Sequence, residues 1–165
     1  MPASISVAVA LKALKHGGGG PSSVGALRFQ TLATAWGTGS DFTTMSSTFV
    51  DITGVTVTPT ALAGERWLVN CDISCFADPG GQSLITRLLL DGSTALRDEH
   101  MVNYIGGGNY NTSRAFSALT PALAAGAHTV KMQGRIVGGQ TGHWELSSPV
   151  TDALTRIQVV ALRTI

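Results

Sequence analysis

The densest group of titratable side chains in the sequence is Asp98-Glu99-His100. A histidine beside two carboxylates has the groups that a general base or a metal ligand requires. Consecutive residues of a loop rarely point the same way, however, and no nucleophile or second histidine lies close to them in the sequence. We therefore interpret the cluster as a solvated loop or as a salt bridge between subunits. The sequence predicts no catalytic residue, no metal site and no cofactor, and hence a protein that is not an enzyme.

A second candidate is a sugar-binding site that contains His143-Trp144-Glu145. An exposed Trp suits the apolar face of a hexose, and the neighbouring carboxylate suits its hydroxyl groups. Tyr104 and Tyr110 flank a glycine run in another predicted loop, and together with Trp144 they are the candidate glycan-binding residues. A buried Trp that anchors the core has the same sequence pattern. The sequence leaves both interpretations open.

The two cysteines, Cys71 and Cys75, lie in one predicted strand. Four residues along a strand span roughly 13 Å, whereas the Cα atoms of a disulfide lie within about 7 Å of each other. The chain has no CxxC motif, and no histidine is near either cysteine in the sequence, so a zinc site has little support. We predict that both thiols are buried and unpaired, in a reducing compartment.

The composition bears on the kind of partner that the chain can bind. Only 13% of its 165 residues are charged, and the 11 basic and 10 acidic residues are spread without runs of either sign. We therefore expect neither nucleic-acid nor membrane binding through a basic patch. The length suffices for one domain with an arm.

Most of the chain consists of predicted strands, which must position these side chains. Short segments rich in Thr, Val, Ile and Leu alternate with Gly, Pro, Asp and Asn, which is typical of an antiparallel sandwich or barrel. The clearest strand is 66–77, where every second residue from Trp67 to Cys75 is apolar. Asp91-Gly92 predicts a tight hairpin turn. The other predicted strands cover residues 27–32, 48–52, 55–58, 83–90, 95–97, 113–119, 128–136 and 154–162, and we expect little helix.

Residues 1–24 are predicted to form an extended arm with a glycine hinge, ahead of a domain at 25–165. The apolar side chains of the arm alternate as in a strand with one buried face, although the same stretch also fits helical spacing. These side chains are Ile5, Val7, Val9 and Leu11. Basic residues follow this stretch instead of preceding it, so we expect no signal peptide. Because an apolar strand at a free terminus invites aggregation, we predict that these four residues bind a partner.

Four motifs follow one another in an order that resembles a known family. They are the threonine-rich segment 49–57, Gly-Glu-Arg-Trp-Leu-Val at 64–69, Leu-Leu-Leu-Asp-Gly at 88–92 and Pro-Ala-Leu-Ala-Ala-Gly-Ala-His-Thr-Val-Lys-Met-Gln at 121–133. Across residues 44–163, this order resembles the small jelly-roll domains of tailed-bacteriophage virion proteins. Those domains are similar in layout to the tumour-necrosis-factor and complement C1q group. The resemblance implies an antiparallel jelly-roll sandwich that forms a homotrimer.

The resemblance also implies a structural protein of the virion, assembled in the host cytoplasm. Because the arm and linker are short, we expect a trimeric capsid decoration (cement) protein. Its arm docks on the major capsid protein or on other virion subunits. The alternative is a tail or neck fibre, or a receptor-binding tip whose loops bind a surface glycan. Apolar residues on both faces of 84–90 and 157–162 favour burial between subunits.

Overall fold

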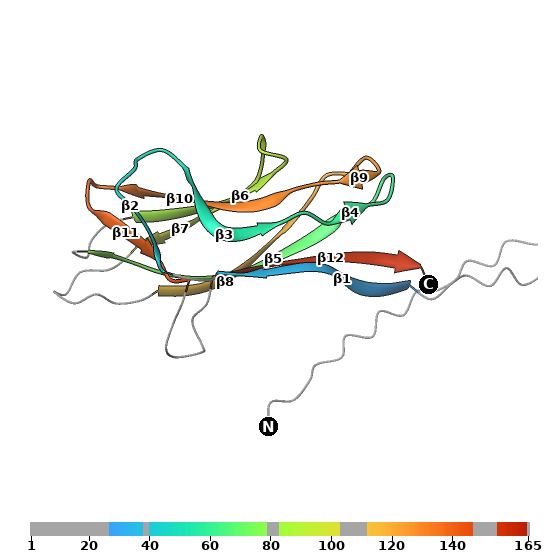
Figure 1. Cartoon of the computed structure of the whole chain (residues 1–165), viewed down its shortest axis with the longest axis horizontal. Coiled ribbons are helices and arrows are strands. Elements are labelled where there is room, and N and C mark those ends of the chain that lie inside the picture. The colour runs from blue at the N-terminus through green and yellow to red at the C-terminus, as the bar shows by residue number, and fades with distance from the viewer. Residues whose placement is uncertain (1–26, 38–39, 79–82, 103–111, 147–154, 165) are drawn as a thin grey trace, which may run out of the picture.

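The computed structural model describes residues 27–37, 40–78, 83–102, 112–146 and 155–164. Throughout these ranges the chain is all-β, and every strand pairing is antiparallel (Figure 1). The prediction of an antiparallel all-β fold is therefore confirmed. The predicted arm, its partner-binding residues and the boundary between residues 24 and 25 lie outside the described residues.

Twelve strands are present in the described part of the chain. They are β1 (Leu27–Trp36), β2 (Phe42–Thr44), β3 (Val50–Val57), β4 (Thr60–Ala61), β5 (Trp67–Asp78), β6 (Ser83–Leu90), β7 (Thr94–Val102), β8 (Thr112–Leu119), β9 (Gly126–Ala127), β10 (Val130–Val137), β11 (Thr141–Trp144) and β12 (Arg156–Thr164).

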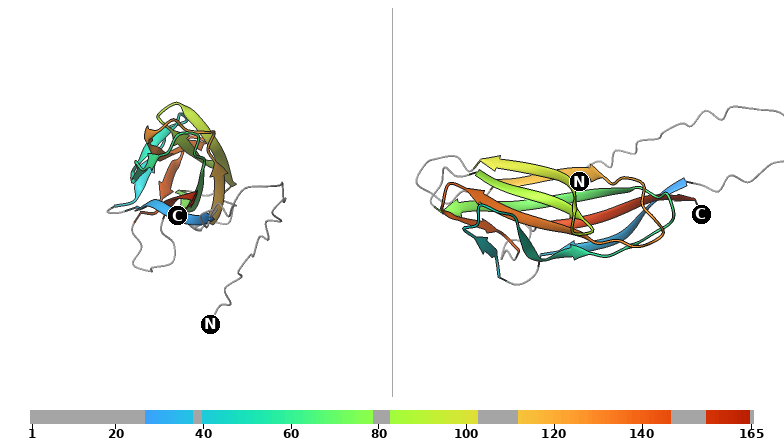
Figure 2. Two further views of the ribbon diagram at one scale, coloured as in Figure 1. Left: turned by 90° about the vertical axis from the view of Figure 1, so that its right-hand side faces the viewer. Right: turned by 90° about the horizontal axis from the view of Figure 1, so that it is seen from above.

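The strands form two sheets that face each other across the core (Figures 1 and 2). The larger sheet follows the order β1-β12-β5-β11-β2, and β8 pairs with the other edge of β5. The smaller sheet follows the order β3-β10-β6-β7, and β4 pairs separately with β9. The sheets curl around the core, as the end-on view in Figure 2 shows. This arrangement is that of a β-sandwich, and jelly-roll connectivity stays a prediction.

The core lies between the two sheets, and strand β5 contributes one row of it. Trp67, Val69, Cys71, Ile73 and Cys75 alternate along this strand, and each is at most 1% exposed. Successive side chains of a strand point to opposite faces, so the residues between them face outward. The core face predicted from the alternating pattern of this segment is confirmed.

Strand β3 joins two segments that the sequence predicted as separate strands around Thr53-Gly54. Gly54 has a positive φ of 82°. The register of β3 against β10 shifts between Lys131 and Gln133, where residues 52–55 of β3 lie opposite the single residue Met132. Pairing with β10 resumes beyond the shift, so β3 continues through Gly54 as one strand.

Strand β7 extends further than predicted and includes the charged residues 98–100. The sequence predicted a return strand at 95–97 only. The preceding turn is confirmed, because Asp91 and Gly92 both have positive φ, at 49° and 71°, as a primed hairpin turn requires. The register of the hairpin shifts once, between Leu88 and Leu89, and β7 pairs with the whole length of β6. Pairing across the hairpin thus makes residues 98–100 part of a strand although they show no apolar alternation.

Candidate interaction surface

The charged cluster of β7 is divided between the two faces of the strand, with Asp98 and His100 on one face and Glu99 on the other. Arg87 donates two hydrogen bonds to Asp98, at 2.7 and 2.8 Å, and they lower the pKa of the Asp98 carboxyl. Glu99 forms ion pairs with Arg97 and Arg114, at 3.0 and 3.4 Å, and the second of these ties β7 to β8. The interpretation as a solvated loop is wrong. The cluster forms salt bridges within the subunit.

Trp144 is buried and has no face to offer to a sugar. Its side chain is 0% exposed, and its indole Nε1 donates a hydrogen bond to Thr86 Oγ1 at 2.8 Å. It points inward because β11 pairs with β5 in a register that places Trp144 opposite the core residue Cys75. The glycan-binding prediction is wrong for Trp144, which is a core anchor instead. Tyr104 and Tyr110 lie outside the described residues.

The two neighbours of Trp144 make contacts along the larger sheet. The His143 ring stacks on the Phe76 ring, with 4.3 Å between their centroids and 3° between their planes. Ser74 Oγ and Glu145 Oε2 are hydrogen-bonded, which links β5 to the residue after β11. These contacts give both polar side chains structural roles in the sheet.

Cys71 and Cys75 are buried and free, as predicted. Burial raises the pKa of both thiols, and that of Cys75 reaches about 12. The Cys75 thiol also contacts Met101, with 3.7 Å between the two sulfur atoms. Because the thiolate is the reactive form of cysteine, these residues act as apolar core side chains.

His128 links three segments at one end of the sandwich. Its Nδ1 lies 2.6 Å from Asp91 Oδ2, and its Nε2 lies 3.0 Å from the carbonyl oxygen of Ala124. Both neighbouring atoms are acceptors, so the ring satisfies both contacts only as a doubly protonated imidazolium. The hydrogen bond to Asp91, and next the one to Ala124, raise the pKa of His128.

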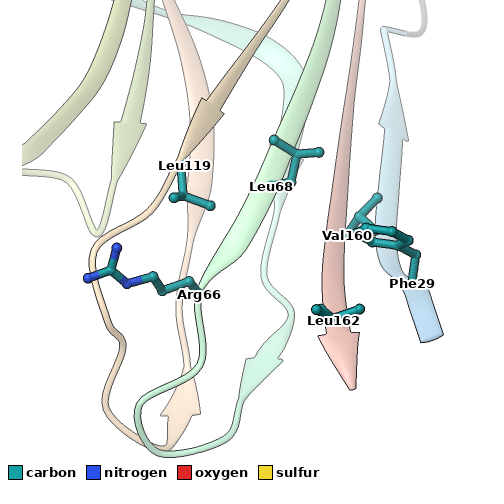
Figure 3. A pocket seen from close by; sticks show the side chains of 6 residues that line it. All are labelled: Phe29, Arg66, Leu68, Leu119, Val160 and Leu162. Atoms are coloured by element: carbon teal, nitrogen blue, oxygen red, sulfur yellow. The ribbon is translucent and has the colours of Figure 1, made fainter. Parts of the chain in front are cut away.

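Five apolar side chains gather on the outer face of the larger sheet, the face turned away from the core (Figure 3). We call them the apolar patch: Phe29, Leu68, Leu119, Val160 and Leu162. Phe29 is 76% exposed, Leu119 58% and Leu162 49%. Together with the exposed Arg66, the patch lines an open hollow of about 330 Å³. A hollow of this lining and size can hold aliphatic side chains.

The pairing register explains why these five side chains meet. Phe29 lies opposite Leu162, while Leu68 lies opposite both Val160 and Leu119. Residues directly opposite on antiparallel strands share one face, so β1, β12, β5 and β8 together build one surface. The residues between them along β5 and β12 face the core. The patch is therefore a consequence of strand alternation on a sheet that carries apolar side chains on both faces.

On the outer face of the smaller sheet, charged side chains are paired with one another, as Asp72 and Arg156 are on the larger sheet away from the patch. Lys131 donates to Asp51 at 2.6 Å, and Arg87 is paired with Asp98. Phe49 also lies here, with the Arg87 guanidinium 3.9 Å from its ring centroid. Aromatic surface on this face is thus covered by a cation, whereas the apolar patch is uncovered in the described chain.

Comparison with known proteins adds no family: no family model matches the sequence, and no curated protein matches it. Among the described residues, no group of three or more His, Cys, Asp or Glu side chains is arranged to hold a metal ion. The described ranges also contain no helix long and apolar enough to cross a membrane.

Proposed function

We propose that this chain is a non-enzymatic structural protein of a tailed-bacteriophage virion, a homotrimer that decorates the head. The apolar patch carries the structural part of this proposal, because contiguous exposed apolar surface marks a protein contact. Burying a Leu, Val or Phe side chain contributes about 1.5 to 3 kcal/mol relative to leaving it in water. The virion assignment rests on the order of motifs between residues 49 and 133, which resembles phage virion domains.

In the proposed trimer, each subunit packs its apolar patch against its neighbours around a three-fold axis. A closed ring of three subunits can cover every patch and leave none open to further growth. The ion-paired outer face of the smaller sheet then faces solvent. This orientation places the apolar patch inside the assembly and the ion-paired face of the smaller sheet outside.

In the same proposal, the N-terminal arm attaches the trimer to the head. The alternating residues Ile5, Val7, Val9 and Leu11 can add as a strand to the edge of a capsid sheet. Such pairing satisfies backbone donors and acceptors while it buries the apolar side chains. Three arms on one trimer bind with a combined strength far above that of one arm.

Quantitative mass spectrometry of purified virions tests the assignment. A head decoration protein is present in many copies, on the scale of the major capsid protein, whereas a fibre or receptor-binding tip is present in only a few. Absence of the chain from virions would overturn the proposal.

A companion test is deletion of residues 1–20. The truncated protein should still fold and form trimers, but it should not bind heads that lack the decoration protein. Undiminished binding would contradict the role of the arm.

A further inference from the structure

The N-terminal segment joins the described fold beside the apolar patch. Strand β1 begins at Leu27, and its third residue, Phe29, is the most exposed member of the patch. The first 26 residues of the chain therefore start from the rim of the hollow. Residues 2–11 among them carry no charged side chain and include the alternating apolar residues of the arm.

The alternating segment of the arm is long enough to cross the patch. The patch crosses four adjacent strands, which at about 4.8 Å between neighbours is about 14 Å. Residues 5–11, if extended at about 3.3 Å per residue, span about 20 Å. Fifteen residues, 12–26, separate this segment from β1, and four consecutive glycines among them let the chain reverse direction. The linker is thus long enough to bring residues 5–11 back over the patch.

We propose that, before assembly, residues 5–11 of the chain's own arm lie over its apolar patch. This inference rests on the proposed function, because it takes the patch as the contact surface between subunits. The arm then acts as a cover that the neighbouring subunit displaces when the trimer forms. Displacement frees the arm to dock on the head. Release of the arm is then coupled to formation of the trimer.

Covalent connection favours the chain's own arm over any other occupant. A segment tethered through a short flexible linker has an effective concentration of about 1 mM, far above that of free subunits in dilute solution. Ordering the arm opposes this contact, since every fixed residue loses backbone freedom. The cover is therefore weak enough to be displaced by a subunit that buries the whole patch.

A thiol reporter beside the patch tests the proposal on the full chain. Thr31 is exposed on β1 directly opposite Val160, so Thr31→Cys leaves all five patch residues in place. Thr56→Cys, at an exposed position of β3 in the other sheet, is the matched control. Cys71 and Cys75 are buried and do not compete for a maleimide reagent. Each reporter is compared with and without the arm substitutions Val7→Asp and Val9→Asp, over a dilution series that includes the monomer.

The proposal expects the reporter at position 31 to react about tenfold more slowly with the natural arm than with the substituted arm. This protection should not change on dilution of the monomer, and the control reporter at position 56 should react equally in both chains. Equal reactivity of the reporter at position 31 in both monomers would overturn the proposal.

Two further outcomes would also overturn the proposal, and they separate its failure from that of the proposed function. Protection that appears only at higher concentration and does not need the arm means that a second copy covers the patch. Protection that needs the arm but disappears on dilution means that the arm comes from a neighbouring copy. In both cases the patch still binds a subunit, so the proposed function stands. If protection and trimers are both absent at every concentration, both proposals fail.

Discussion

At the scale of single residues, protonated His128 donates hydrogen bonds to two segments at one end of the sandwich. The ring contacts Asp91 in the β6–β7 turn and Ala124 in the segment before β9. Asp91 in turn accepts a hydrogen bond from the backbone N–H of Thr129 at 2.8 Å. These contacts connect a hairpin turn to a loop distant in sequence. The strength of that connection depends on pH because the imidazolium is the form that can donate both bonds.

The raised pKa of His128 predicts a decrease in stability with rising pH. The folded chain binds the proton more tightly than the unfolded chain, whose histidine has a pKa near 6.5. The contribution is therefore complete below the unfolded pKa and is lost as the pH rises through the higher folded value. Urea unfolding over this pH range should show this loss in the natural chain, and His128→Gln should remove it. A His128→Gln chain with an unchanged pH dependence would contradict this account.

The buried indole of Trp144 allows a second residue-scale prediction. Thr86→Val keeps the shape of the side chain but removes the oxygen that accepts the Trp144 Nε1 hydrogen bond. A buried N–H without a partner costs about 1 to 3 kcal/mol. Chemical denaturation should show this decrease in the free energy of unfolding, whereas Thr56→Val at an exposed position should change it little. Equal stability of the Thr86→Val chain would mean that this hydrogen bond contributes nothing.

At the scale of strands, Glu65 links the segment before β5 to the end of β12. Arg163 donates to the Glu65 carboxylate at 2.6 and 2.9 Å, and Trp67 Nε1 donates at 3.1 Å. The hydrogen bonds from Arg163 are the main cause that lowers the pKa of Glu65 to about 2. Only 6% of the Glu65 side chain is exposed, so this link is largely shielded from solvent.

The low pKa of Glu65 predicts that its contribution to stability is lost in acid. The contribution is present above the ordinary value of 4.5 and disappears as the pH falls from there through about 2. At neutral pH, Glu65→Gln should lower the free energy of unfolding by about 1.5 to 3 kcal/mol, as expected for hydrogen bonds to a charged group. The difference between the two chains should shrink steadily as the pH falls. A difference independent of pH would contradict the role of the charge.

Strand positions differ in how far the sequence alone predicts them. The core face of β5 follows from local alternation, and the Asp91-Gly92 turn follows from backbone preferences. The irregularity at Gly54 depends on pairing with β10, which is distant in the sequence. The full length of β7 depends on pairing with β6 across the hairpin. The residue pattern within a single segment encodes neither. The glycan-binding prediction for Trp144 is wrong for a similar reason. Only the register of β11 against β5 decides that this side chain points inward.

The residue pattern within single strands also does not predict the apolar patch as a whole. Leu68 follows Trp67 in a strand whose alternate residues are core, so the sequence marks Leu68 as an outward apolar side chain. Phe29 and Leu119 join it only because β1 and β8 lie in the same sheet as β5. The sequence did predict apolar residues on both faces of 157–162, and Leu162 is indeed half exposed on the outer face.

At the scale of the whole molecule, the apolar patch occupies one end of the larger sheet's outer face, while further along that face Asp72 is ion-paired with Arg156. The smaller sheet pairs its charges within the subunit, for example Lys131 with Asp51. The larger sheet exposes the apolar patch at the end where β1 begins and β12 ends (Figure 3). Burial of the patch between subunits, with the charged face outward, is the central claim of the proposed function.

Sedimentation velocity at micromolar concentration tests that claim most directly. The natural chain should sediment with three times the mass of the 17.1 kDa subunit. Leu119→Asp and Leu162→Asp place charges at exposed positions of the patch, so each chain should fold but sediment as a monomer. Val137→Asp, at a comparably exposed position of the smaller sheet, should remain trimeric. A natural chain that is entirely monomeric, or patch variants that remain trimeric, would contradict the account.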